Sequence, residues 1–168
     1  MMRKDENLKE ILNVSVSLFW TAIFLGPVAW FCIEYLSIKL LLILLSVSLI
    51  AYFIKPFRIK HAMLHSKWVL MIGKLTQDGS FINKLMRKRY KGFRVIRGKK
   101  DLRNFRNKTR IREAFHFQMF LFLSFLFFYA LYLQLWGWAA FMLLSNFLYN
   151  IWPLLFLQYQ WERIKKIK

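Results

Sequence analysis

Residues 11–33 read ILNVSVSLFWTAIFLGPVAWFCI, and this uncharged stretch decides the fold class. A helix of this length, at about 1.5 Å per residue, covers roughly 35 Å, which is enough to cross the ~30 Å hydrocarbon core of a bilayer. Basic residues precede the stretch, as they do in a signal peptide, but acidic residues are mixed with them and the apolar run is too long. We therefore expect an uncleaved first transmembrane span.

Three further apolar stretches follow, at residues 40–54, 114–133 and 138–157. Residues 34–39 separate the first two spans and residues 134–137 separate the last two, so both breaks are short enough to force antiparallel connections. The sequence therefore predicts an all-α membrane protein with about four transmembrane helices arranged as two hairpins.

The positive charge is concentrated in one part of the chain. The protein is 58% hydrophobic, yet it carries 27 Lys and Arg residues against 8 Asp and Glu residues. Nineteen of the 27 lie in residues 55–112, seven lie near the two chain ends, and only Lys39 falls between the first two spans. Four spans would put 26 basic residues on one side, and the positive-inside rule places that side in the cytoplasm. We expect a multi-pass protein of the cell membrane with both termini cytoplasmic.

This distribution divides the chain into three regions. Residues 1–54 hold the N-terminal tail and the first transmembrane hairpin, residues 55–112 form a basic cytoplasmic segment, and residues 113–168 hold the second hairpin and a basic C-terminal tail. Within the basic segment, residues 57–75 mix apolar with basic side chains. That mixture predicts a helix lying in the membrane interface.

Two more helices are expected in the basic segment. Residues 81–91 suit a short one. A longer helix begins at Asp101, which would cap it, and runs without a helix-breaking residue into the third span. Helical structure therefore carries the basic side chains up to the membrane surface.

The basic segment has two interpretations. The simpler one is topological, because Lys and Arg next to spans bind anionic lipids at ~1 kcal/mol each. The functional one adds attraction of an anionic substrate or an acidic carrier protein. No nucleic acid is expected as a partner, since the aromatic residues lie in the spans and not between the basic residues, where base stacking would need them.

Metal binding has little support in the sequence. His61 and His65 are four residues apart and would share a helix face, but no third ligand is evident, so interfacial contacts explain them better. Cys32 is the only cysteine, which excludes a disulfide within the chain and a cysteine-based zinc site. We expect no metal and no bound cofactor.

Glu113 and His116 are the strongest candidates for chemistry. They are three residues apart on the expected helix and share a face where the third span enters the cytoplasmic leaflet. A carboxylate beside an imidazole fixes its tautomer and raises its basicity, as a general base for an alcohol requires. The alternative is a structural charge pair at the helix end with Arg110 and Arg112.

The fourth span adds a second set of polar residues. Asn146, Asn150 and Pro153 share one face, and Gln158 follows where the span returns to the cytoplasmic side. Because the last two spans are antiparallel, we expect Gln158 at a depth similar to that of His116. Pro153 also leaves a nearby backbone carbonyl without its helical donor. Asparagines in membrane bundles often only bind helices together, so substrate-binding and structural roles are both open.

These motifs resemble those of a known enzyme family. The run Thr109-Arg-Ile-Arg-Glu113-Ala-Phe-His116-Phe117 resembles the Thr-x-x-x-Glu-x-x-His-Trp stretch of the glycosyl-4,4'-diaponeurosporenoate acyltransferases, small bacterial membrane enzymes of carotenoid synthesis. Phe117 stands where that family has Trp. The likeness extends over roughly residues 67–163.

Two other segments contribute to the resemblance. Asn150-Ile-Trp-Pro153, followed by Gln158, is similar to the Asn, Pro and Gln motif near the C-terminus of that family. Residues 74–84 are similar to the turn that follows its basic, Trp-containing segment. The run Tyr-Gln-Trp-Glu at residues 159–162 departs from the family, which has Arg-Tyr-Asn-Arg after the Gln.

The resemblance implies a membrane acyltransferase that moves a fatty acyl group onto a sugar hydroxyl of a glycosylated carotenoid or similar glycolipid. In that reaction His116 would be the general base and Glu113 would orient it, while Asn150 and Gln158 would hold the sugar or the developing oxyanion. The donor would be an acyl thioester of coenzyme A or of an acyl carrier protein. A protein of another class, a non-enzymatic scaffold or anionic-lipid binder in the bilayer, is the alternative, and the oligomeric state is left open.

The charge distribution yields a prediction about topology. In a Cys32→Ala background, cysteines introduced at Ser37 and Gln134 should react with a membrane-impermeant reagent in intact cells, because both turns face outward. A cysteine at Ser80 should react only after the cells are opened, because the basic segment is cytoplasmic. The reverse labelling pattern would rule this topology out.

Overall fold

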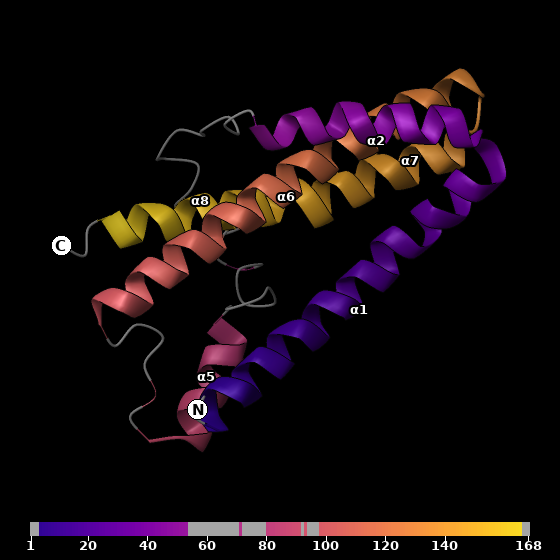
Figure 1. Ribbon diagram of the computed structural model, residues 1–168. Coiled ribbons are helices and arrows are strands. Elements are labelled where there is room, and N and C mark those ends of the chain that lie inside the picture. The colour runs from indigo at the N-terminus through magenta and orange to yellow at the C-terminus, as the bar shows by residue number, and fades with distance from the viewer. Residues whose placement is uncertain (1–3, 54–70, 72–79, 92, 94–97, 166–168) are drawn as a thin grey trace.

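The computed structural model describes residues 4–53, 71, 80–91, 93 and 98–165. Every regular element in these residues is helical, which confirms the all-α class. In chain order (Figure 1) they are α1 (Lys4–Tyr35), α2 (Ile38–Phe53), α5 (Ser80–Arg89), α6 (Lys99–Tyr132), α7 (Trp136–Ser145), the π-helical η1 (Asn146–Ile151) and α8 (Trp152–Lys165). Apart from Met71, the predicted interfacial helix over residues 57–75 lies outside the described residues, and so do His61 and His65.

Three helical segments are long and apolar enough to cross a membrane. They are Asn7–Tyr35, Lys100–Tyr132 and Trp136–Glu162, and they correspond to the first, third and fourth predicted spans. The predicted second span is α2, whose 16 residues cover only about 24 Å. Three candidate membrane spans are therefore established by length and composition, while a fourth crossing stays a prediction.

A short break connects α1 to α2. α1 continues to Tyr35 and α2 begins at Ile38, so the break is shorter than the predicted residues 34–39. Ser37 explains the early restart, because its hydroxyl accepts a hydrogen bond from the N–H of Leu40 at 3.3 Å. A serine in this position satisfies a backbone donor in the first turn of a helix.

The turn between α6 and α7 lies beside this break. Gln134 has a φ of 59°, in the left-handed region, and thereby reverses the chain. The hydroxyl of Tyr129 on α6 donates a hydrogen bond to the carbonyl of Tyr35 at the end of α1, at 3.0 Å. Figure 1 accordingly shows both connections at one end of the molecule and the two chain ends at the other.

α6 is the central helix of the fold and packs against α2, α7, η1 and α8. It begins at Lys99 with Gly98 as its N-cap, two residues before the predicted start. Asp101 is therefore not the cap, but as an acidic residue in the first turn it still stabilises the positive end of the helix dipole. The 34 residues of α6 extend about 51 Å, so its basic N-terminal part reaches beyond the ~30 Å hydrocarbon layer.

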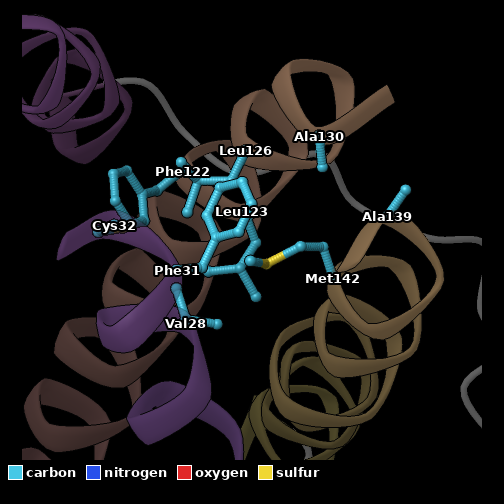
Figure 2. Close-up of a cluster of buried hydrophobic side chains, with 9 residues drawn as sticks. All are labelled: Val28, Phe31, Cys32, Phe122, Leu123, Leu126, Ala130, Ala139 and Met142. Carbon is cyan, nitrogen blue, oxygen red and sulfur yellow. The ribbon is translucent and has the colours of Figure 1, made fainter. Parts of the chain in front are cut away.

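The main apolar core lies near the two connections. Figure 2 shows side chains from α1, α6 and α7 interlocking there, with Phe31 and Leu126 fully buried. The Phe31 ring also contacts Tyr129 and Trp138, with ring centroids 6.5 and 5.4 Å apart. This core fixes the C-terminal half of α1 against the other helices.

The N-terminal half of α1 packs differently. Ile82 and Met86 of α5, together with Phe93, form a second buried cluster against Leu8 and Leu12 of α1. Figure 1 shows α1 diverging from α6 and α8 toward this end, with α5 beside it. The predicted short helix over residues 81–91 thus exists, at Ser80–Arg89, and its apolar face packs against α1.

The core yields a prediction about stability. Phe31→Ala should lower the unfolding free energy of the detergent-solubilised protein by about 2 kcal/mol, because between lipid-embedded helices mainly the cavity and lost contacts matter. Ile33→Ala is the matched control, since Ile33 lies two residues away on α1 and is 82% exposed. Thermal unfolding of both variants checks this, and equal melting temperatures would contradict the packing described.

Candidate active site

The α6 wall of the site carries the predicted pair Glu113 and His116. Both side chains are half-buried, and Thr109, one turn before Glu113, is buried with its hydroxyl bonded to the Phe105 carbonyl at 2.9 Å. From Ala114 onward the helix is almost entirely apolar. The pair therefore stands where α6 changes from a charged to an apolar helix.

The opposite wall is the π-helical turn η1, in which Asn146, Tyr149 and Asn150 are buried. Pro153 follows on α8 and has no N–H, so the Tyr149 carbonyl lacks the donor that an α-helix would supply. A π-helical turn widens the helix and commonly marks functional sites. Here Asn146 of this turn bonds to α6, and the Tyr149 ring contacts His116.

Buried amides connect η1 to α6. Nδ2 of Asn150 donates to Oδ1 of Asn146 at 2.9 Å, and Nδ2 of Asn146 donates to the Phe120 carbonyl and to Oγ of Ser124, both at 3.0 Å. The Ser124 hydroxyl in turn donates to the same Phe120 carbonyl at 2.7 Å. Because Nδ2 of Asn150 is used in this amide network, the orientation of its side chain is fixed and Oδ1 is left as an acceptor.

His116 lies at the end of the amide network. The Asn150 side chain and the Tyr149 main chain both lie next to its imidazole. Nδ1 of His116 and Oδ1 of Asn150 are both buried, and neither makes a hydrogen bond. Two buried polar atoms with unused hydrogen-bonding capacity thus lie at the α6–η1 boundary, as is frequent at sites of chemistry.

Aromatic rings link His116 to α1. His116 contacts Tyr149 edge-on at 5.8 Å, Tyr149 contacts Phe24 at 5.8 Å, and Phe24 stacks on Trp20 at 5.7 Å between centroids. The Tyr149 hydroxyl is hydrogen-bonded to Oγ1 of Thr21 at 2.8 Å. Tyr149 is therefore held from both sides, by α1 at its hydroxyl and by His116 at its ring.

These walls enclose a pocket of about 400 Å³. Ser17, Trp20 and Phe24 line it from α1, Arg112 and His116 from α6, and Tyr149 from η1. The rest of its lining is aliphatic or aromatic, with Pro153 contributed by α8. The site thus combines an apolar interior with a few polar groups, two of them, Arg112 and His116, on α6, which is typical of a site for an amphiphilic ligand.

The predicted site residues take different places. His116 lines the pocket, whereas Glu113, Asn150 and Gln158 are not among the described residues that do. Asn150 is fully buried behind His116, and Gln158 is buried on α8 next to Leu157, which lines the pocket. Within the described part of the chain, no three His, Cys, Asp or Glu side chains gather as a metal site would require.

Sequence reasoning missed the α1 wall. Trp20 and Thr21 lie in an apolar span with no pattern that separates bundle-facing from lipid-facing residues. Tyr149 offered a usable signal, because it lies next to Asn150 and four residues before Pro153, and that spacing identifies it as the residue whose carbonyl loses its donor.

Comparison with known proteins agrees with these motifs. The family model CrtO, described as glycosyl-4,4'-diaponeurosporenoate acyltransferase, matches residues 66–168, which include α5, α6, α7, η1 and α8. No curated protein and no solved structure matches the chain. Since the matched region is more than half of the sequence and contains His116 with all of its neighbours on η1, the chain belongs to the glycosyl-4,4'-diaponeurosporenoate acyltransferase family.

Proposed function

We propose that this protein transfers a fatty acyl group from a thioester to a sugar hydroxyl of a glycosylated carotenoid or a similar glycolipid in the membrane. The observation that carries the proposal is an imidazole, adjoined by a buried amide network, on the wall of an apolar pocket between candidate membrane spans. Membership in an acyltransferase family supports the reaction type. A site within the bilayer lets both lipid tails stay in hydrocarbon while the reacting groups meet.

His116 would act as the general base in this reaction. The sugar hydroxyl gives its proton to the imidazole while its oxygen attacks the thioester carbonyl carbon. The tetrahedral oxyanion then collapses, the C–S bond breaks, and the leaving thiolate takes the proton from the imidazolium. The products are an ester and a free thiol, and His116 ends in its starting state.

The residues around His116 would divide the remaining tasks. Glu113, one turn earlier on α6, keeps its predicted role of orienting the imidazole. Asn150 is better placed to accept a hydrogen bond from Nδ1 than to reach a sugar, because it is fully buried and its Nδ2 is bonded to Asn146. Holding Nδ1–H in this way leaves Nε2 as the atom that exchanges protons. Gln158 keeps its predicted part in binding the sugar or the oxyanion.

The basic residues on the cytoplasmic side would attract the donor. Four basic residues are exposed along the N-terminal part of α6 and precede the pocket residue Arg112 in the helix. They are Arg103, Arg106, Lys108 and Arg110. Acyl thioesters of coenzyme A carry phosphates, and acyl carrier proteins are acidic, so both donors are attracted by such a surface. We propose that the donor approaches along this side of α6.

A first prediction concerns His116. His116→Ala should reduce acyl transfer about 10²–10⁴-fold, equivalent to roughly 3–5 kcal/mol of transition-state stabilisation, because the general base is lost. Glu113→Gln should lower turnover strongly while leaving the protein in the membrane. Mass spectrometry of the acylated glycolipid measures turnover, and the melting temperature in detergent is recorded on the same samples.

Gln118→Ala, which removes another half-buried polar side chain of α6, is the control. Near wild-type turnover of His116→Ala would rule out a catalytic role for His116.

A second prediction separates two roles of Asn150. If Asn150 acts through His116, Asn150→Leu should lower kcat roughly tenfold or more and leave KM for the glycolipid almost unchanged. In the His116→Ala background the same substitution should then have little further effect, because residues that act as a unit are not additive. A double variant whose losses multiply, with KM raised, would assign Asn150 to the sugar instead.

A further inference from the structure

Acyl transfer between two lipids requires separate places for two tails, and the structure contains a pocket whose occupant is so far unassigned. Its interior is apolar, formed by aromatic side chains of α1 and by aliphatic and aromatic side chains of η1 and α8. Its polar groups are few, and two of them, Arg112 and His116, come from one helix, four residues apart. An occupant must therefore be mostly hydrocarbon, with a polar end that meets α6.

The volume distinguishes between the two lipids. An apolar cavity of about 150 Å³ binds one benzene molecule, which has six carbons, so a pocket of about 400 Å³ accommodates roughly 16 carbons. This is the size of one ordinary fatty acyl chain. A carotenoid has a much longer polyene and carries a sugar as well, so it does not fit within the same volume.

A series of ring contacts leads away from His116 along the lining of the pocket. Starting from His116, successive contacts lead to Tyr149, then Phe24, then Trp20. Trp20 is thus the last ring of this series and the largest side chain on the α1 wall. It is also held in place, because it stacks on Phe24 and meets Phe19 edge-on at 5.3 Å.

We propose that this pocket binds the acyl chain of the thioester donor, with the carbonyl carbon at His116 and the methyl end at Trp20, so that Trp20 limits the chain length. The identification of the chain as that of the donor rests on the proposed function. The glycolipid acceptor then approaches His116 from outside the pocket. Burying each methylene contributes about 0.8 kcal/mol relative to water, so chains that fill the pocket without meeting Trp20 bind best.

The test replaces Trp20 by a smaller residue. Trp20→Leu should raise kcat/KM for long acyl thioesters relative to short ones by about tenfold in a competition between saturated chains of graded length, because one methylene in an apolar pocket changes selectivity by roughly that factor. Trp30→Leu is the matched control, since Trp30 lies on the same helix but is 64% exposed and outside the pocket. An active Trp20→Leu enzyme with unchanged chain-length preference would overturn the proposal.

A binding experiment keeps this inference separate from the catalytic one. A palmitoyl-coenzyme A analogue with a diazirine at its methyl end is irradiated with the His116→Ala variant, and the labelled residues are mapped by mass spectrometry. Labelling of α1 near Trp20, lost on competition with unmodified palmitoyl-coenzyme A, supports the pocket even if no acyl transfer is found in the wild type. Displacement by a glycosylated carotenoid alone, or labelling spread over lipid-facing residues, would refute it.

Discussion

A hydrogen-bonding group inside a membrane-spanning bundle must find its partner in the protein, because the surrounding hydrocarbon offers none. In this molecule the constraint is met between α6 and η1, where Asn146 bonds the Phe120 carbonyl and Asn150 bonds Asn146. These bonds fix the rotation of the last predicted span against the central helix. They also place Asn150 and the Tyr149 carbonyl beside His116, so the same polar contacts that align two helices also define the surroundings of the imidazole.

The pocket follows from the way α1 is anchored. Its C-terminal half is packed into the main core around Phe31, whereas its N-terminal half packs on α5 through Ile82 and Met86. Between these two anchoring points α1 diverges from α6 and α8 (Figure 1), and the hydrogen bond from Thr21 to Tyr149 connects it back to η1. A helix that packed on α6 along its whole length would fill this space with its own side chains.

Much of this arrangement was predictable from the sequence, because the responsible signals are local. Uncharged stretches indicated three long spans, and the spacing of Glu113 and His116 placed them on one helix. Helix ends were less accurate: α6 starts at Lys99 and not at Asp101, since Gly98 is the N-cap and Asp101 lies in the first turn. The pairing of Asn150 with His116 and the contribution of Trp20 were not predictable, because α1 is apolar on all sides and the sequence does not record which side meets its neighbours.

The position of the pocket between candidate membrane spans has a consequence for how the proposed acyl transfer is measured. A lipid substrate of the proposed reaction reaches the site by diffusion in two dimensions, so the relevant concentration is its mole fraction in the surrounding lipid and not its molarity in the buffer. Added detergent lowers that mole fraction even when the total amount of substrate is constant. Rates measured in micelles therefore obey surface-dilution kinetics, and variants are comparable only at a fixed ratio of substrate to detergent.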